Sequence, residues 1–431
     1  MEMKKYKLGE IATVEISGVD KKTKDNEIPV RLCNFTDVYH NWAITKEMTD
    51  SFMQASANQK EIDSFSLKKG QVAFTKDSET RDDIGIPTYI ADDFENVVLG
   101  YHTALITPDK SKLSGKYLNA FMNTRYIQKY FENNASGSGQ RYTLSNETLN
   151  AIPVIAPDLQ AQEKIGDVFS NIDKKIALNC RMNAKLEQMA KRLYDHWFVQ
   201  FDFPNADGKP YKASGGKMVW NETLKREIPQ GWEVGKIGDF VEIITKGTTP
   251  STAGFEFEQI GINFVKVECI ENGKILTENL MHISEEANRA LKRSQLQEND
   301  ILVSIAGRLG SSAVVSKNVL PANTNQAVGI IRLRNDFKFL AYYLYERIVS
   351  DDVQRHLQGA NAQSIQKNLT LPNLAEIIFP YDKDFRVLSD FTTKTLSIFN
   401  YQLSIEKETA KLTALRDRLL PLLMNGQVEV R

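Results

Sequence analysis

Two long stretches of the chain carry seam residues at spacings that alternate between four and three. In the first stretch these positions are Ile165, Phe169, Ile172, Ile176, Asn179, Asn183, Leu186, Ala190, Leu193 and Trp197. This is a heptad seam, because two positions in every seven face the same side of a helix. The register recurs 226 residues further on, with more polar members, at Phe391, Thr395, Ile398, Gln402, Ile405, Thr409, Leu412, Arg416, Leu419 and Leu423. The pattern predicts two long helices that can bury their seams against each other.

The segments that precede the two helices also resemble each other. At an offset of 229 residues, the string 7–10 (KLGE) recurs as 236–239 (KIGD), and the apolar run 71–74 recurs as 300–303. Nearer the helices the offset is 223, which aligns Gln140 with Gln363, Asn150 with Asn373, and Pro157 with Pro380. Two unrelated amphipathic helices are the alternative, but matched blocks before each helix favour an internal duplication.

The duplication predicts the order globular block, helix, globular block, helix. The fold class is α+β: two similar mixed α/β domains separated by two long antiparallel coiled-coil helices, in a pseudo-two-fold internal repeat. We expect domain 1 at 1–156, spacer helix 1 at 157–202, domain 2 at 203–380 with a linker arm at 203–230, and spacer helix 2 at 381–431. A helix of about 35 residues is about 50 Å long, or about 15 base pairs of duplex, so the helix pair could space two reading domains.

Local patterns predict the main elements of each block. Residues 116–131 and 337–357 have helical periodicity, whereas 97–106 and 328–333 are β-rich. Residues 203–216 are rich in Pro, Gly, Asn and Asp, and the stretch 203–230 also holds Pro210 and Pro229, which predicts an irregular arm.

Composition narrows the class of protein. The chain is 42% hydrophobic and 25% charged, and no run of about 18 apolar residues predicts a membrane span. The N-terminus lacks the apolar core of a signal peptide. The three cysteines, Cys33, Cys180 and Cys269, are far apart, which disfavours disulfides or a zinc site and favours the cytoplasm. A net charge of −1 excludes a globally basic DNA-coating protein, but not a locally basic groove.

Motifs of catalysis are missing from the sequence. There is no GxxxxGK[ST] phosphate loop, no GxGxxG opening a helix, and no Asn-Pro-Pro-Tyr methyltransferase string. Five histidines occur singly, and no carboxylate cluster indicates a metal. We therefore expect a binding protein with no catalytic residue, metal or cofactor of its own. A DNA nuclease or methyltransferase with a cryptic site is the enzyme alternative.

Several strings have a recognisable order. The turn 244–251 (ITKGTTPS), the strand 264–268 (FVKVE) with 273–275, the run 299–304 (NDILVS) with Gly307 and Gly310, and the loop 325–327 (NQA) follow one another in block two. Residues 157–162 (PDLQAQ) lead into the first helix, and His102-Thr103 replaces Asn-Gln in block one. In this duplicated setting they resemble the specificity subunits of Type I restriction–modification enzymes.

This resemblance implies a function and a set of partners. Each globular block would be a target recognition domain that reads one half of a bipartite, asymmetric site in double-stranded DNA, and the helices would be the conserved spacer. The partners would be two modification (methyltransferase) subunits and a restriction subunit that acts as an ATP-dependent translocase and nuclease. S-adenosylmethionine, ATP and magnesium are expected on those partners. The alternative with the same fold is a stand-alone duplicated DNA-binding protein.

Candidate contacts follow from side-chain chemistry. Short hydroxyls, amides and cations in turns suit phosphates, and Gln and Arg can pair with adenine and guanine edges. The DNA-binding candidates are Lys246, Thr248, Thr249, Ser251, Arg308, Gln326, Gln363, Gln140, Arg141, Tyr142, Lys21, Lys22 and Lys24. Plain turns and solvated loops would have the same composition. Apolar positions beyond one seam predict a subunit interface at Met189, Leu193, Trp197, Leu415, Leu419 and Leu422.

Overall fold

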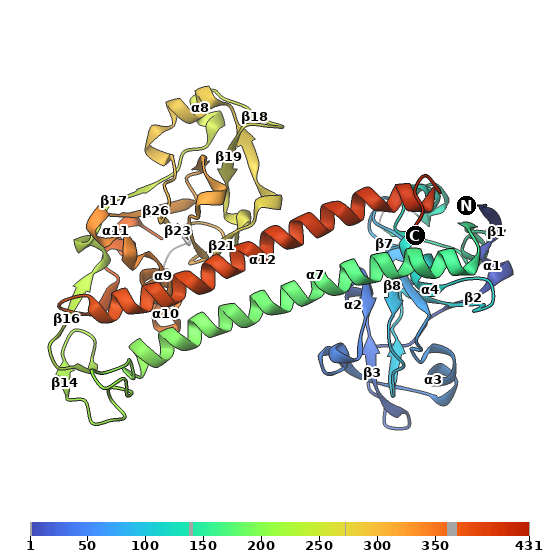
Figure 1. Ribbon diagram of the computed structural model, residues 1–431, viewed down its shortest axis with the longest axis horizontal. Helices are drawn as coiled ribbons and strands as arrows, with labels where there is room; N and C mark the ends of the chain where they lie inside the picture. The colour runs from blue at the N-terminus through green and yellow to red at the C-terminus, as the bar shows by residue number, and fades with distance from the viewer. Residues whose placement is uncertain (1, 138–140, 272, 360–368, 431) are drawn as a thin grey trace. The chain divides into compact units, whose positions relative to one another are not determined.

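The computed structural model describes residues 2–137, 141–271, 273–359 and 369–430. The chain divides into unit 1, Met1–Met182 with Ser404–Arg431, and unit 2, Asn183–Leu403. Each unit therefore holds one globular block and a segment of each long helix (Figure 1).

The predicted long helices are confirmed as α7 (Leu159–Tyr194) and α12 (Arg386–Met424). In unit 1, the Asn179 side chain donates to Glu408 Oε2 at 2.9 Å and to Thr409 Oγ1 at 3.2 Å. In unit 2, Gln402 Nε2 donates to the backbone carbonyl of Asn183 at 3.2 Å. The first part of α7 thus meets the last part of α12 in unit 1, and the reverse holds in unit 2, so the pairing is antiparallel in both.

Polar residues interrupt the seam between α7 and α12. Asn179 and Gln402 are each 1% exposed. Their side-chain oxygens, and that of Asn183, have no hydrogen-bond partner among the described residues. A buried polar group lowers stability but penalises shifted registers, which would leave it without its partners.

Unit 1 contains three larger sheets and one strand pair. Its strands are β1 (Lys4–Lys7), β2 (Ala12–Ile16), β3 (Ile28–Cys33), β4 (Ala43–Ile44), β5 (Met53–Ala57), β6 (Val72–Thr75), β7 (Asp77–Ser78), β8 (Pro87–Ile90), β9 (Val97–Leu99), β10 (Thr103–Pro108), β11 (Ser136–Gly137), β12 (Tyr142–Thr143) and β13 (Pro153–Ala156). Its short helices are α1 (Leu8–Ile11), α2 (Phe35–His40), α3 (Gln59–Phe65), α4 (Gly115–Met122), α5 (Arg125–Asn134) and α6 (Asn146–Asn150). The sheet orders are β2-β10-β6-β8-β4, β5-β3-β9 and β11-β12-β7, and β1 pairs with β13.

Unit 2 repeats the central part of this topology. Its strands are β14 (Met218–Asn221), β15 (Arg226–Pro229), β16 (Trp232–Lys236), β17 (Val241–Lys246), β18 (Phe257–Glu258), β19 (Ile262–Val265), β20 (Ile270–Glu271), β21 (Lys274–Ile275), β22 (Met281–Ile283), β23 (Ile301–Ser304), β24 (Ser312–Val314), β25 (Ala322–Thr324), β26 (Val328–Leu333) and β27 (Ile378–Asp382). Its short helices are α8 (Glu285–Ala290), α9 (Ala341–Val349), α10 (Asp351–Gly359) and α11 (Leu371–Ala375). The orders β17-β26-β23-β24 and β22-β19-β25, with β16 pairing β27, match β2-β10-β6-β8, β5-β3-β9 and β1-β13 of unit 1, and β18 is an addition of unit 2.

Equivalent hydrogen bonds support the duplication inside each unit. The Tyr117 hydroxyl donates to the carbonyl of Ile155, and the Tyr343 hydroxyl donates to the carbonyl of Pro380, both at 2.6 Å. Both tyrosines are fully buried, on α4 and α9 respectively. The same helix is therefore fixed to the same strand by the same contact in the two blocks.

A second equivalent contact uses different chemistry. Gln71 accepts from the backbone of Lys68 at 2.7 Å and donates to Thr107 at 2.8 Å. At the matched place Asp300 accepts from the backbone of Gln297 at 2.7 Å and receives two hydrogen bonds from Arg332, at 2.6 and 2.8 Å. Burial raises the pKa of Asp300, although Arg332 opposes this shift. The acidic residue of the 299–304 string is thus a structural anchor.

The sequence alignment near the helices was wrong by two residues. The hydrogen bonds of Tyr117 and Tyr343 show that Pro380 corresponds to Ile155. The sequence alignment had paired Pro380 with Pro157. Thr103 pairs with Thr75 as Val328 pairs with Ser304, so His102 corresponds to Ala327 and not to Asn325. A two-residue shift preserves the alternation of inward and outward positions in a strand, so the hydrophobic pattern did not reveal it.

Predicted helices 116–131 and 337–357 are each broken. α4 ends at Met122, and Thr124 caps α5 by accepting from the backbone of Ile127. In unit 2 a 3-10 turn (Asn335–Leu340) precedes α9, and Ser350 separates α9 from α10. Small hydroxyl residues at the breaks compete with helix continuation by bonding the backbone.

Two further predictions on secondary structure need correction. The β-rich run 97–106 is split between β9 and β10, which belong to different sheets. The arm 203–230 is not wholly irregular, because it contains the β14–β15 hairpin.

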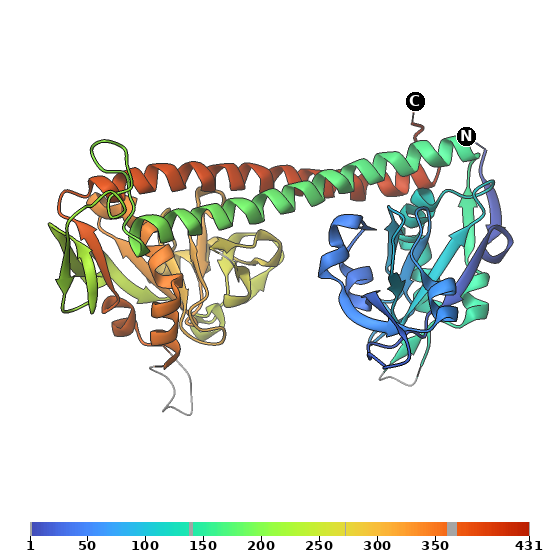
Figure 2. The same cartoon turned by 90° about the horizontal axis from the view of Figure 1, so that it is seen from below.

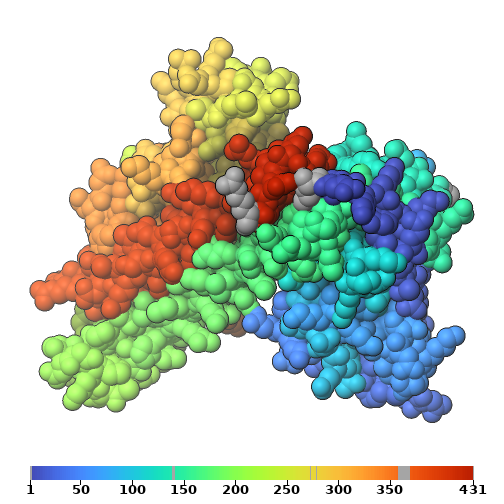
Figure 3. All heavy atoms as spheres, turned by 45° about the vertical axis from the view of Figure 1, so that its right-hand side comes forward, coloured from blue at the N-terminus to red at the C-terminus, as the bar shows by residue number. Residues whose placement is uncertain are grey.

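The predicted subunit-interface residues differ in exposure. Met189 is 59% exposed and Leu415 is 45% exposed, whereas Trp197 is 4% exposed and packs on Phe391. Leu193 packs against the core of unit 2, Leu419 packs against that of unit 1, and Leu422 is half-buried. Within each unit the globular block lies to one side of its helix segments (Figure 2). The outer faces of these segments are open to view in Figure 3. Among the described residues, no helix combines the length and apolarity needed to cross a membrane.

We expect Asn179→Leu to stabilise unit 1, because leucine removes a buried amide oxygen that lacks a partner. The free energy of unfolding should rise by about 1 kcal/mol, and Tm by roughly 2–4 °C, measured by calorimetry. Cys180→Leu, at an exposed position on the next residue of α7, is the control and should leave Tm unchanged. A lower Tm for Asn179→Leu would show that its hydrogen bonds to Glu408 and Thr409 stabilise the seam on balance.

Candidate DNA interface

In unit 1, one edge of the five-stranded sheet collects three loops. Thr103 pairs with Thr75, Ala104 with Ile16, and Phe74 with Pro87. The ends of β2 and β6 therefore lie beside the starts of β10 and β8. The segments 17–22, 76–86 and 100–102 extend from these strand ends, and the second of them contains β7.

A polar cluster lies at this edge. His102 Nδ1 is 2.5 Å from Asp77 Oδ2, and Arg141 approaches His102 Nε2 at 3.2 Å. Lys76 Nζ contacts Asp77 Oδ1 at 2.8 Å and Thr143 Oγ1 at 3.0 Å. An ionised carboxylate only accepts, so the Nδ1–H of His102 donates to Asp77. In the neutral ring Nε2 is then the acceptor for Arg141.

The charge of Asp77 organises the cluster. Burial acts to raise the pKa of this carboxyl group. Hydrogen bonds from Lys76, Thr143 and His102 outweigh burial and hold the pKa below its ordinary value. Asp77 is therefore an anion at neutral pH, and it orients His102, which in turn orients Arg141.

Aromatic rings extend the cluster on both sides. Lys21 Nζ lies 5.5 Å from the centre of the Tyr101 ring, and Arg81 Cζ lies 5.0 Å from that of Tyr142. Together with Lys76 and Arg141, four cationic side chains gather here although the whole chain is near neutral. Cations interleaved with aromatic rings are the chemistry of nucleic-acid surfaces.

Sequence reasoning identified only part of this cluster. Arg141, Tyr142 and Lys21 were predicted, but Asp77 and His102 were not given a role. His102 has φ 68°, in the left-handed region that non-glycine residues seldom adopt. The available signal was its place directly before β10, beside the loop that follows β6.

The other predicted residues of block one lie apart from the cluster or outside the described residues. Lys24 forms an ion pair with Glu27 at 3.0 Å. The pKa of Glu27 is lowered first by the Ser56 hydroxyl and then by Lys24. Lys22 is exposed, and Gln140 lies outside the described residues. Lys24 is therefore paired with an acidic neighbour and has no contact with Asp77, His102 or Arg141 among the described residues.

The equivalent edge of unit 2 brings together the loops after β17 and before β26. A Cβ on Gly247 would lie 2.1 Å from the carbonyl of Thr324 and 2.2 Å from that of Asn325, so glycine permits this approach. The Thr249 hydroxyl donates to Gln326, and Arg293 donates to the Thr248 hydroxyl at 3.2 Å. Three predicted residues, Thr248, Thr249 and Gln326, are thus neighbours, and Arg293 is an addition to them.

Three more predicted residues of block two are exposed near this edge. Lys246 ends β17, Ser251 lies in a 3-10 turn, and Arg308 lies in the turn between β23 and β24. The backbone of Ile305 donates to the carbonyl of Ala327 at 2.8 Å, which brings the turn that carries Arg308 towards the Gln326 loop. Gln363 lies outside the described residues. Across the part of the chain that the structure describes, no group of three or more His, Cys, Asp or Glu residues could hold a metal ion.

Known proteins share this organisation. The Type I restriction enzyme HindI specificity subunit of Haemophilus influenzae is 25% identical, over 99% of this chain and all of that protein. The MjaIX specificity subunit of Methanocaldococcus jannaschii is 26% identical, over 74% of this chain and 71% of its own. The crystal structure of a Type I restriction-modification system S subunit from M. genitalium has a TM-score of 0.59 at 14% identity, covering 98% of this chain and 96% of that one, which indicates a shared fold.

The match extends over both globular blocks. The profile of the Type I restriction modification DNA specificity domain covers residues 1–188 and 229–405. These ranges contain the polar edge of unit 1 and the Thr249–Gln326 edge of unit 2. The chain therefore belongs to the Type I restriction–modification DNA specificity family.

Proposed function

We propose that this chain reads a bipartite, asymmetric DNA site, one half with the loop edge of each unit. In this proposal it also holds modification and restriction subunits on the DNA and catalyses no chemistry itself. The observation that carries the proposal is the cluster of Asp77, His102, Arg141 and their neighbouring cations at a sheet edge.

In unit 1 the cluster is suited to base reading. A guanidinium can donate two hydrogen bonds to guanine in the major groove. Arg141 is exposed, and the chain Asp77–His102–Arg141 restricts its orientation before DNA arrives. Pre-orientation reduces the entropy lost on binding. Lys21 would contact phosphates, which adds affinity without sequence information, whereas Lys76 is already bound by Asp77 and Thr143.

In unit 2 the candidate for base reading is an uncharged amide. Gln326 can pair with adenine through its amide, and Thr249 holds that amide in place. Lys246, Ser251, Arg293 and Arg308 would supply phosphate contacts. The two edges carry different side chains, and different side chains imply different half-sites.

The partner subunits supply the chemistry in this proposal. Two modification subunits would use S-adenosylmethionine to methylate DNA, and a restriction subunit would use ATP and magnesium. The exposed Met189 and Leu415 on the long helices are the remaining apolar candidates for holding them. Methylation or cleavage by the purified chain alone would favour the enzyme alternative. Sequence-specific DNA binding by a chain that binds no modification or restriction subunit would favour a stand-alone DNA-binding protein.

Arg141→Ala should weaken binding to the native site about tenfold or more, because one good bidentate base contact contributes about 1–3 kcal/mol of discrimination. Titration of labelled duplexes by fluorescence anisotropy, at fixed salt, measures the change. The site itself can be obtained from the methylation pattern of the host genome. Lys24→Ala is the matched control, since Lys24 is paired with Glu27 and should change affinity little. Equal losses on native and unrelated DNA would assign Arg141 to phosphates instead.

Replacing residues 1–156 with the corresponding block of another family member should change one half of the recognised site and preserve the other. The reason is that each unit has its own complete sheet and loop edge. The readout is the methylated sequence produced when the chimera is expressed with its modification subunit. A reciprocal exchange of residues 231–380 is the control and should alter the other half. Changes in both halves from one exchange would contradict independent reading.

A further inference from the structure

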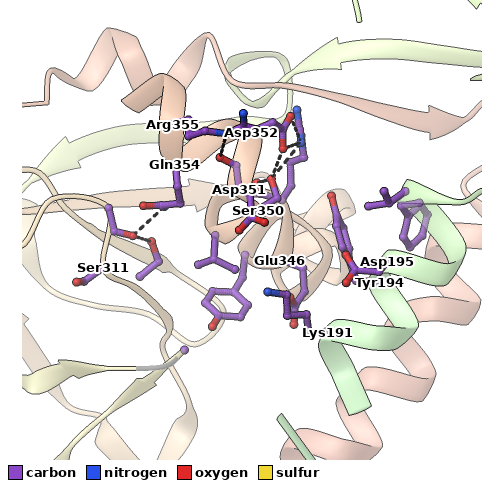
Figure 4. A pocket seen from close by; sticks show the side chains of 18 of the residues that line it. Lys191, Tyr194, Asp195, Ser311, Glu346, Ser350, Asp351, Asp352, Gln354 and Arg355 are labelled. Carbon is purple, nitrogen blue, oxygen red and sulfur yellow. Dashed lines mark hydrogen bonds and ion pairs between the residues drawn. The ribbon is translucent and has the colours of Figure 1, made fainter. Parts of the chain in front are cut away.

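Unit 2 contains a cavity of about 1150 Å³ that the DNA-reading proposal does not use, apart from Arg308 at its edge. It is lined by the last turns of α7, by α9 and α10, and by the segments around Gly273 and Gly310 (Figure 4). All lining residues lie between 184 and 380, so the cavity belongs to one unit.

A buried carboxylate faces into this cavity. Glu346, on α9, is 6% exposed and lies opposite the end of α7, which carries Lys191, and the π-helical turn Asp195–Val199 that follows α7 (Figure 4). No hydrogen bond or ion pair to its carboxylate occurs among the described residues. Burying such a group without a partner is costly, so its presence calls for an explanation.

The fold does not require a carboxylate at this position. The Tyr343 and Tyr117 contacts align α9 with α4, which places Ala120 at the position of Glu346. Ala120 is fully buried in unit 1. An alanine therefore completes the same helix packing, and Glu346 is an addition specific to unit 2.

The neighbouring charges leave an excess of acid. Arg347 is already held by Asp352 at 2.7 Å and by the carbonyl of Ile378 at 2.9 Å. Arg226 donates to the carbonyl of Val199 and lies over the Phe201 ring. The charged groups that line the cavity are Glu187, Lys191, Asp195, Arg226, Glu271, Arg308, Glu346, Arg347, Asp351, Asp352 and Arg355.

Burial is the main cause of the raised pKa values of three carboxyl groups in this cavity. Burial raises the pKa of Glu346 to about 8, helped by Asp195 and Glu187 and opposed by Lys191. Burial also raises the pKa of Asp195 and that of Glu187. Lys191 is the cation that opposes the pKa shifts of Glu346 and Asp195, whereas Lys274 opposes that of Glu187. A further cation beside Glu346 would let its carboxyl group ionise. Tyr194, Tyr345, Phe198 and Leu309 add walls suited to an alkyl chain.

We propose that this cavity binds an alkylammonium or alkylguanidinium group, with Glu346 as its buried counter-ion and Asp195 and Glu187 as further acceptors. The group could be the side chain of a lysine or arginine presented by a partner subunit, or a free polyamine. This site does not depend on the DNA-reading proposal, because its residues other than Arg308 lie outside the two edges.

The test uses the full chain and agmatine, which carries a guanidinium and an ammonium on one alkyl chain. Isothermal titration calorimetry at pH 7, in two buffers of different ionisation enthalpy, gives affinity and proton release together. We expect close to one proton released per agmatine, because Glu346 must ionise to pair with the cation. Glu346→Gln should lower the affinity at least about tenfold and abolish the proton release. Glu285→Gln, at an exposed position of unit 2 that does not line the cavity, is the matched control and should preserve both.

Two results would overturn the proposal: absence of agmatine binding to the native chain, or equal binding and proton release by Glu346→Gln. Where agmatine binds, its source is tested by assembly with the modification subunit. Inhibition of assembly by agmatine identifies a basic side chain of that subunit as the natural occupant. Assembly unaffected by saturating agmatine identifies a free polyamine.

The dependence of Tm on pH gives a second test that does not rely on agmatine being the right ligand. Below about pH 4.5 the Glu346 carboxyl is protonated in both the folded and unfolded chain. Between about 4.5 and 8 it ionises only on unfolding, so the native Tm should fall relative to that of Glu346→Gln as pH rises through this window. Saturating agmatine should remove this loss of native Tm, because the bound cation stabilises the ionised carboxylate. Parallel Tm curves would mean that the carboxylate is already compensated, and would contradict the site.

Discussion

The packing of α7 against α12 is the constraint on which both units depend. Neither globular block is complete by itself, because each takes core residues from both helices. Ile165 and Phe169 of α7, with Leu423 of α12, belong to the core of unit 1. Tyr194 at the end of α7 and Trp197 in the π-helical turn that follows it, with Phe391 of α12, belong to the core of unit 2. Each large apolar side chain buried in this way stabilises its unit by about 1.5–3 kcal/mol.

The buried polar residues of the seam select one register of α7 against α12. A uniformly apolar seam would tolerate sliding by one heptad, which would displace the helix residues from both cores. The amide nitrogen of Asn179 donates to Glu408 and Thr409, and that of Gln402 donates to the backbone of Asn183, in this register. The incomplete bonding of their oxygens is a loss of stability that accompanies this selection. Register and core composition are therefore set by the same few side chains.

The sequence predicted the features that depend on periodicity and missed those that depend on pairing across space. The heptads of α7 and α12 could be predicted because burial of the seam imposes a repeat that is visible in a single amino-acid sequence. The breaks at Thr124 and Ser350 were missed, since apolar periodicity continues across them while one hydroxyl redirects the backbone. The cluster of Asp77, His102 and Arg141 joins three segments that are far apart in the sequence, so no local motif predicts it. Thr249 and Gln326 were both named as candidates from the sequence, but their contact also joins distant segments and was not predicted.

Comparison of the duplicated blocks separates what the fold needs from what each block adds. The tyrosine on α4 and α9 is kept with its hydrogen bond, because it fixes the helix to a strand in both units. The link between Gln71 and Thr107 becomes the ion pair of Asp300 and Arg332, so the geometry is kept while its chemistry changes. At the loop edges neither geometry nor chemistry is kept: a buried Asp77 orients His102 in unit 1, whereas Gly247 allows close backbone contact in unit 2. Packing tolerates few solutions, but loops at a sheet edge are bounded by solvent on one side, so they can diverge without disturbing the core. A duplicated scaffold can therefore present two unlike surfaces, which is what an asymmetric site requires of a protein that reads it with two similar domains.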